Sequence, residues 1–336
     1  MSPAPSPASA EGAYRVLVVV PCLNEERHLP ELLATLCADP GAADAHIVVV
    51  DGGSEDSSAD IVRRAAAEDP RVRLLDNPKR IQSAAINLAA RQFGAAEYLI
   101  RVDAHARYPA DYVARLIGAC EESGADCVTV SMRAEAASPT CFEQANAAAQ
   151  NSVLGAGGSP HRKPGPRRWV EHGHHALMRM KTFSDAQGYN EAFTHNEDAE
   201  LDARIRAKGG KILLAADIVI GYFPRANARA LLRQYFRFGA GRARMLLLHR
   251  EPPKPRQLAP ALILPALLLA PFAPFWIWAA APAALWLIAC FGFGALLGLK
   301  QKSLCAAWSG FPAALMHLGW SAGFWSGALA SLGAKR

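Results

Sequence analysis

The chain has 336 residues, a formal net charge of +6 and seven cysteines. A chain of this length holds one large domain or two ordinary ones. The cysteines are scattered without a C-x-x-C pair, which suits a reducing compartment and argues against a zinc framework. Residues 1–13 are rich in Pro, Ala and Ser without an apolar core, so we expect a disordered tail and no signal peptide.

Short apolar runs alternate with segments of helical spacing over the first hundred residues. The predicted strands are 15–20, 46–50, 72–75 and 98–102. The predicted helices between them are 27–38, 57–68 and 81–93. This alternation predicts the α/β class, with a parallel sheet covered by helices. Ligands of such sheets bind at the carboxyl ends of the strands.

Unusual polar clusters follow three of these strands. Asn24-Glu25 follows the first strand, Asp51-Gly52-Gly53 the second, and Asp103 and His105 the fourth. Two residues apart in an extended segment, Asp103 and His105 point to the same side. A carboxylate and an imidazole placed in this way can share a metal ion or one polar ligand, or they can form a solvated strand end.

The order and spacing of these clusters resemble the pattern of glycosyltransferase family 2, which has the GT-A fold. The clusters read P-x-x-N-E, D-G-G-S-x-D-S and D-x-H. The resemblance continues in HNEDAELD at 195–202 and in QYFRF at 234–238, which is similar to the family's Q-x-x-R-W motif with Phe in place of Trp. It covers residues 15–245 and looks most like the succinoglycan-type exopolysaccharide glucosyltransferases. It implies a Rossmann-like nucleotide-diphospho-sugar transferase domain over 14–225.

The resemblance also implies which residues bind a UDP-sugar donor. These are Pro21, Asn24, Glu25, Asp51, Gly53, Arg80, Asn87, Asp103 and Arg237. Carboxylates such as Asp51 can accept hydrogen bonds from the edge of a pyrimidine ring and from ribose hydroxyls. For Arg80 and Asn87 the alternatives are a solvated arginine and an asparagine on a helix surface.

Asp103 and His105 occupy the place where the family usually has D-x-D. The resemblance therefore implies a divalent cation, Mg or Mn, held by Asp103 and His105 against the donor diphosphate. Imidazole suits Mn or Zn better than Mg. Direct hydrogen bonding of His105 to a phosphate is the alternative to metal binding.

A catalytic base and acceptor contacts are implied further along the chain. Inverting transfer needs a base that removes the proton of the attacking hydroxyl, and the resemblance assigns this role to Asp198. The alternative for the Glu197-Asp198 pair is simple charge at a helix start, where the dipole favours anions. The implied acceptor contacts are His174, His175, Glu197 and Gln234. A zinc site in EHGHHALMRM at 171–180 is the alternative for the histidines.

Two basic segments have both a phosphate-binding and a plainer interpretation. Residues 155–168 form either a basic loop that closes over a phosphate or a solvated linker. Arg229, Arg233 and Arg237 recur every four residues, which predicts a basic amphipathic interfacial segment over 226–256. Arg237 is also expected to meet the donor diphosphate, because guanidinium forms a planar fork for phosphate oxygens.

Two long uncharged stretches predict a membrane region at 257–333 with two to three helices. Gln257 to Leu299 contains no Asp, Glu, Lys or Arg and is long enough for two crossings. The second stretch, 303–334, is long enough for one crossing or for an interfacial helix. The basic residues between Arg225 and Arg256 predict that the preceding domain faces the cytoplasm. A nucleic-acid patch is the alternative for these residues, and we expect no nucleic acid partner.

We therefore predict an inverting hexosyltransferase in the inner cell membrane, with several passes and a cytoplasmic catalytic domain. The expected reaction moves glucose from UDP-glucose to an oligosaccharide on a polyprenyl diphosphate in exopolysaccharide biosynthesis. Membrane lipid and other polysaccharide-biosynthesis enzymes are the expected partners. The rival interpretations are a processive polysaccharide synthase, a polyprenyl-phosphate sugar synthase and a non-enzymatic membrane scaffold.

Overall fold

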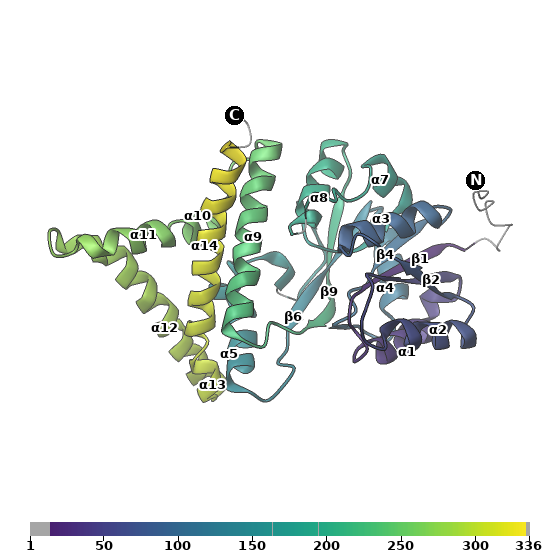
Figure 1. The fold of residues 1–336 in the computed structure, drawn as a ribbon, viewed down its shortest axis with the longest axis horizontal. Coiled ribbons are helices and arrows are strands. Elements are labelled where there is room, and N and C mark those ends of the chain that lie inside the picture. The colour runs from purple at the N-terminus through teal and green to yellow at the C-terminus, as the bar shows by residue number, and fades with distance from the viewer. Residues whose placement is uncertain (1–13, 163, 194, 334–336) are drawn as a thin grey trace.

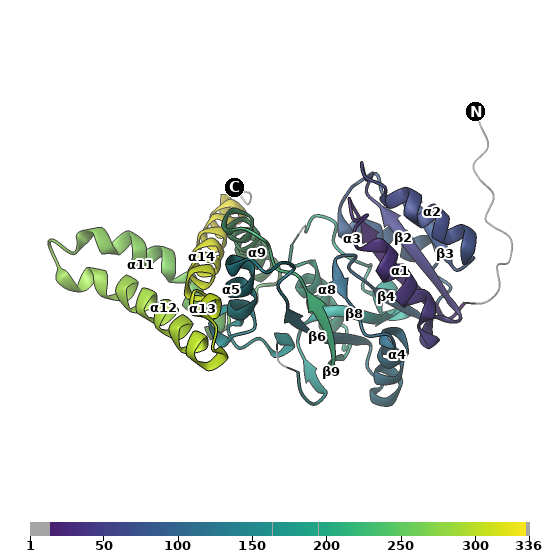
Figure 2. The same cartoon turned by 90° about the horizontal axis from the view of Figure 1, so that it is seen from below.

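The structure, a computed structural model, describes residues 14–162, 164–193 and 195–333. Figures 1 and 2 show an elongated molecule, with a helix-covered sheet at one end and a group of long C-terminal helices at the other. The GT-A α/β fold followed by apolar C-terminal helices, predicted from the sequence, is confirmed.

One mixed sheet of nine strands forms the centre of the first part, counting the residues that the structure describes. The strands are β1 (Val16–Cys22), β2 (Ala45–Asp51), β3 (Val72–Asp76), β4 (Tyr98–Arg101), β5 (Ala106–Arg107), β6 (Cys127–Ala134), β7 (Arg168–Val170), β8 (His174–Arg179) and β9 (Ile212–Tyr222). Their order is β3-β2-β1-β4-β8-β6-β9-β5, with β7 also paired to β9. The first four are mutually parallel, as predicted, whereas β8 runs antiparallel to both β4 and β6.

Helices cover both faces of this sheet. They are α1 (Leu29–Ala38), α2 (Ser58–Glu68), α3 (Gln82–Gln92), α4 (Tyr112–Ser123), α7 (Met180–Asp185) and α8 (Glu197–Ala207). Two further helices, α5 (Cys141–Gln150) and α6 (Val153–Ala156), pack toward the C-terminal helices. Val16, Val18 and Val20 of β1 pack into one core with the leucines of α1. Leu17 and Val19 pack into a second core with α3. A strand buried on both faces is continuously apolar, which explains the run VLVVV.

The C-terminal part contains a helical hairpin that projects away from the sheet (Figures 1 and 2). The helices of the C-terminal part are α9 (Ala228–His249), α10 (Pro255–Ala261), α11 (Ile263–Leu269), α12 (Ala281–Gln301), α13 (Leu304–Ala307) and α14 (Gly310–Gly333). Among the described residues, the segments Pro255–Phe272 and Ile277–Gln301 are long and apolar enough to cross a membrane. They form the two arms of the hairpin, and its tip exposes Phe275, Trp276 and Trp278.

The last helix, α14, lies along α9 instead of standing free (Figures 1 and 2). Gly319, Gly323 and Gly327 recur every four residues on its contact face. A Cβ atom on Gly323 would overlap the carbonyl oxygen of Phe236 on α9. Small residues at this spacing let two helix backbones approach closely. The sequence analysis allowed either a membrane crossing or an interfacial helix for the second uncharged stretch. In the structure this stretch contains α14, which packs against the basic helix α9.

A disulfide joins the two parts of the molecule. Cys141 at the start of α5 is bonded to Cys305 in α13, 164 residues further along the chain. The other five cysteines are free. This disulfide differs from the reducing compartment that the scattered cysteines suggested. The packing of α13 on α5 brings the pair together, and no local spacing in the sequence indicates it.

Candidate active site

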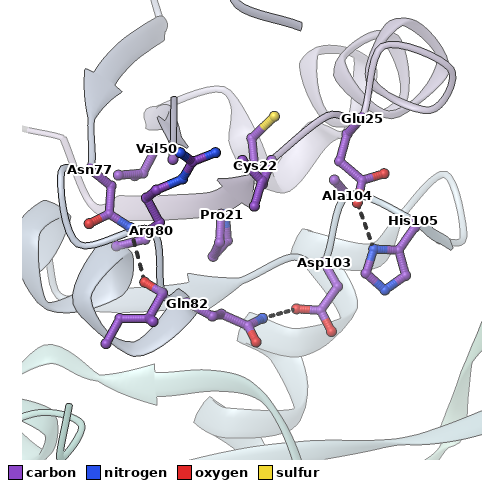
Figure 3. A pocket seen from close by; sticks show the side chains of 14 residues that line it. Pro21, Cys22, Glu25, Val50, Asn77, Arg80, Gln82, Asp103, Ala104 and His105 are labelled. Atoms are coloured by element: carbon purple, nitrogen blue, oxygen red, sulfur yellow. Dashed lines mark hydrogen bonds and ion pairs between the residues drawn. The ribbon is translucent and has the colours of Figure 1, made fainter. Parts of the chain in front are cut away.

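An open cleft lies at the carboxyl ends of β1, β2 and β4, where the sheet topology predicts ligand binding. Its volume is about 600 Å³, including space open to solvent. Five predicted site residues line it, namely Pro21, Glu25, Arg80, Asp103 and His105. Figure 3 shows these side chains around the cleft, with Arg80 on the side opposite His105.

Asp51, Gly53 and Asn24 build the turn beside this cleft. Asp51 Oδ2 accepts hydrogen bonds from the backbone N–H groups of Gly53 and Ser54, each at 3.0 Å. Gly53 has φ +77°, a left-handed conformation that glycine adopts without strain. Asn24 Oδ1 accepts from the backbone N–H of Glu55 at 2.8 Å. The three residues therefore fix the shape of the turn, and the neighbouring Gly52 forms part of the cleft wall.

Asp103 and His105 are both held by neighbouring side chains (Figure 3). Asp103 Oδ1 accepts from Gln82 Nε2 at 2.6 Å and from Arg101 Nε at 3.1 Å. His105 Nδ1 lies 2.9 Å from Glu25 Oε1. Asp103 Oδ2 is 3.6 Å from His174 Nε2, beyond hydrogen-bond distance.

The donor set at this place fits a cation shared with a substrate. Among the described residues there is no group of three or more His, Cys, Asp and Glu arranged to hold a metal. Mg²⁺ at nucleotide sites is usually held by one or two carboxylates, while waters and phosphate oxygens complete the coordination. Asp103 supplies one such carboxylate, and His105, which lines the same cleft, would add a nitrogen ligand.

Arg101 connects this cleft with the predicted catalytic region, and our sequence analysis missed it. It is 5% exposed. Its Nη1 donates to Asp198 Oδ1 at 2.6 Å and lies 3.6 Å from Glu197 Oε1, while its Nε binds Asp103. The signal was present in RVDAH, since Arg101 stands two residues before Asp103 and shares its side of the strand.

The two adjacent carboxylates at the start of α8 have opposite pKa shifts. Burial disfavours the charge on Asp198, but the charges of Arg101, His175 and His174 outweigh this and lower its pKa. Burial, reinforced by the charge of Asp198, raises the pKa of Glu197 to about 7. Asp198 therefore stays ionised under conditions in which Glu197 takes up a proton.

The two predicted acceptor histidines lie in different surroundings. His175 is fully buried, with Nδ1 2.7 Å from Tyr189 Oη and Nε2 2.7 Å from Asp202 Oδ1. His174 stands between the two site carboxylates, with Nδ1 3.9 Å from Asp198 Oδ2. His174 is therefore placed toward both carboxylates, whereas His175 is held by Tyr189 and Asp202 and has its Nδ1 3.5 Å from Asp198 Oδ1.

Gln234 and Arg237 of α9 lie outside the cleft lining. Gln234 Nε2 donates to Tyr222 Oη at 3.1 Å. Arg237 is exposed. Burial and then the charges of Arg237 and Arg225 lower the pKa of His195 to about 4, so Arg237 stands near the segment that leads into α8.

Asn87 also lies away from the cleft, in a buried network. Its Nδ2 donates to the carbonyl of Tyr189 at 2.8 Å and to Glu191 Oε1 at 3.1 Å, and its Oδ1 accepts from the N–H of Tyr189. We expect Asn87→Ala to lower the free energy of unfolding by about 1–3 kcal/mol, because buried backbone groups lose their partners. A thermal melt together with the KM for the donor checks this. A raised donor KM with an unchanged melting temperature would instead assign Asn87 to donor binding.

The raised pKa of Glu197 predicts a pH-dependent change in stability. The folded protein holds this proton up to a pH of about 7, whereas an unperturbed glutamate releases it near 4.5. Folding therefore loses stability as the pH rises between these values. We expect Glu197→Gln to raise the melting temperature by several degrees at pH 8 and by less at pH 5. An equal difference at both pH values would contradict the shift.

Comparisons with known proteins agree with this fold. The mannosyltransferase PcManGT from Pyrobaculum calidifontis, solved with GDP-Man and Mn2+, aligns over 94% of this chain and 89% of its own at 21% identity, with a TM-score of 0.53. GalNAc-T7, solved with UDP, GalNAc and Mn2+, aligns over 70% of this chain and 48% of its own at 14% identity, with a TM-score of 0.52. These likenesses confirm the GT-A fold.

Sequence comparison identifies the family. Residues 17–186 match the family model described as glycosyl transferase family 2. The succinoglycan biosynthesis protein ExoA of Rhizobium meliloti (strain 1021) is 46% identical over 310 residues, which is 92% of this chain and 93% of that protein. The chain therefore belongs to glycosyltransferase family 2 and is an enzyme of that family.

Proposed function

We propose that this enzyme transfers glucose from UDP-glucose, with inversion, to an oligosaccharide on a polyprenyl diphosphate in exopolysaccharide biosynthesis. The observation that carries the proposal is the link through Arg101, which joins Asp103 in the donor cleft to Asp198 at the start of α8. Sugar transfer requires the donor phosphate and the attacking hydroxyl to lie close together. The contacts of Arg101 hold the donor cleft next to Asp198, the proposed base. The likeness to ExoA, a protein named for succinoglycan biosynthesis, supports the assignment to exopolysaccharide synthesis.

The donor would lie in the cleft at the ends of β1, β2 and β4. Glu25 and the Asp51 turn would contact the nucleoside, while Arg80 would approach the phosphates. Asp103 and His105 would hold a Mg or Mn ion, as the Mn2+ in the structures of two fold relatives suggests. Such an ion supplies positive charge to the departing diphosphate.

Asp198 would accept the proton of the acceptor hydroxyl. The lowered pKa keeps its carboxylate charged, and the bond to Arg101 fixes its orientation. His174 and Glu197 adjoin it and would contact the acceptor sugar, with Gln234 further out on α9. The departing diphosphate needs no proton, so one carboxylate beside the acceptor is sufficient.

The hairpin would hold this site at the cytoplasmic face of the inner membrane. Lys254 and Arg256 begin its first arm, and Lys300 and Lys302 end its second, while the tip carries no charge. Basic residues at both ends predict that both ends are cytoplasmic. This location would bring the cleft close to a lipid-linked acceptor and to other polysaccharide-biosynthesis enzymes.

Donor turnover by the detergent-purified protein tests the proposal. UDP-, GDP- and dTDP-sugars are offered with Mg or Mn, with and without polyprenyl-diphosphate-linked saccharide. We expect UDP release that needs the metal, rises with the acceptor and is abolished by EDTA. A folded protein that releases no nucleotide from any donor in the presence of acceptor would overturn the proposal.

A second candidate acceptor is a bare polyprenyl phosphate. An undecaprenyl-phosphate 4-deoxy-4-formamido-L-arabinose transferase of Pseudomonas syringae pv. syringae (strain B728a) is 38% identical over 111 residues, a stretch covering 32% of this chain and 33% of that protein. Extraction of the labelled product separates the two cases. A lipid that carries a single sugar supports the second candidate, and a lengthened oligosaccharide supports the first.

A further inference from the structure

Five basic side chains lie near the root of the membrane hairpin, on α9, on α10 and at positions 161, 162 and 172. We call this group the root cluster; it consists of His161, Arg162, His172, Arg242 and Arg256. Arg256 Nη2 lies 3.4 Å from His172 Nε2, and the rings of His161 and His172 are 6.4 Å apart between centroids. Arg242 and His172 line the same small cavity. Burial and then the charge of Arg256 lower the pKa of Arg242 to about 10.

Two acidic residues near this cluster form ion pairs with basic residues outside it. Glu251 pairs with Arg206 at 2.9 Å, and Glu171 pairs with Lys254. Within the described parts of the chain, Arg162, Arg242 and Arg256 form no ion pair with a carboxylate. Arg242 and Arg256 repel one another at partly buried positions, so an anion bound between them would be stabilised. Arg162 follows His161 in the chain, and its guanidinium carbon lies 5.4 Å from the ring centroid of Tyr222.

Two buried polar atoms of the cluster also lack hydrogen-bond partners among the described residues. They are His161 Nδ1 and Arg162 Nη1. A buried donor without a partner costs about 1–3 kcal/mol. A ligand that forms hydrogen bonds with these atoms would remove that cost. Phosphate oxygens fit them, because the planar guanidinium binds phosphate with two parallel hydrogen bonds.

The two histidines of the cluster are suited to donate hydrogen bonds without adding charge. Burial and the charges of Arg242 and Arg256 lower the pKa of His172 to about 3. Burial and the charge of Arg162 lower the pKa of His161 well below its ordinary value. Both rings are therefore neutral at pH 7, and each offers one N–H group.

The position of the root cluster connects the membrane with the catalytic carboxylate. Arg256 belongs to the first apolar arm of the hairpin, Pro255–Phe272. His172 is two residues from His174, which lies 3.9 Å from Asp198. A ligand with a lipid tail along the hairpin and phosphates at the root cluster would thus carry its sugar toward Asp198.

We propose that the root cluster binds the diphosphate of the lipid-linked acceptor, with Arg162, Arg242 and Arg256 as the charged contacts. This proposal rests on the proposed function, because it names the part of the site that receives the acceptor. The same chemistry would also recognise a phospholipid headgroup or the diphosphate of the donor. The experiment below separates these sources.

Direct binding tests the proposal without turnover. The probe is a short-chain polyprenyl diphosphate added to the full-length protein in detergent, with the corresponding polyprenol as the uncharged control. We expect Arg242→Gln and Arg256→Gln to raise the Kd for the diphosphate at least 10-fold, with little change for the polyprenol, because each loses a charged hydrogen bond. Arg64→Gln, an exposed substitution on α2, controls for loss of charge and should bind like the wild type.

The outcomes distinguish the sources of phosphate. Wild-type affinity in both cluster variants would overturn the proposal, and so would displacement of the probe by an equal concentration of phosphatidylglycerol. A raised donor KM with unchanged probe binding would assign the cluster to the donor diphosphate instead. A melting temperature equal to that of the wild type shows that the variants are folded. Because the probe needs no sugar transfer, binding can be measured even if the proposed reaction is absent.

Discussion

Replacement of Arg101 by glutamine is expected to reduce sugar transfer at least 100-fold and to destabilise the protein. The guanidinium is buried and lies against Asp103, Asp198 and Glu197. Its removal leaves these carboxylates close together without a counter-charge. Breaking a buried pair in this way costs about 3–5 kcal/mol, and loss of a preorganised charge at a reacting centre costs about 10²–10³ in rate.

Arg101→Lys separates the charge from its geometry. Lysine keeps one positive charge but cannot donate from Nε and Nη1 to two carboxylates at once. We expect this variant to melt closer to the wild type than Arg101→Gln while transfer remains at least 10-fold impaired. Transfer kinetics and thermal melts on the three proteins provide the measurement. Wild-type transfer by Arg101→Gln would show that the link between cleft and base has no role in the reaction.

Replacement of Asp198 by asparagine is expected to lower kcat by about 10²–10⁴ through loss of general-base catalysis. The KM for the donor should change little, because Asp198 contacts Arg101 and does not itself line the donor cleft. The amide retains the shape of the carboxylate and can still contact Arg101 through its oxygen. Steady-state kinetics at saturating donor and acceptor measure the effect.

Glu197→Gln is the matched control for this substitution, because it neutralises the neighbouring carboxylate on the same helical turn. We expect it to retain most of the transfer activity. The opposite result, with Asp198→Asn active and Glu197→Gln inactive, would make Glu197 the base. Its pKa of about 7 would suit that role, because a general base is most effective when its pKa lies near the working pH.

Local pattern was sufficient to predict the elements of the first hundred residues. The four predicted strands and three predicted helices correspond to β1–β4 and α1–α3 because their periodicity and turn residues agree. The antiparallel insertion of β8 between β4 and β6 was not predicted. It depends on a pairing between segments far apart in the chain, for which no local signal exists.

The candidate site was predicted in its parts but not in its connections. The residues Glu25, Arg80, Asp103 and His105 were predicted and do line one cleft. Arg101 was missed because a single charged residue at the end of a short strand looks like a solvent-exposed strand end. Its role becomes visible only when the fold brings Asp198, 97 residues away, into contact with it. Asn87 has a helix-face position that the sequence alone cannot distinguish from a cleft position.

The packing of α14 on α9 has a consequence for how the enzyme can be released from lipid. The hairpin is an insertion between two helices that complete each other, since α9 precedes it and α14 follows it. Shortening the chain before the hairpin would strip α9 of its glycine-lined partner and expose a new apolar face. A water-soluble form is therefore better reached by excising the hairpin from within and bridging the gap with a flexible linker, so that α14 is retained.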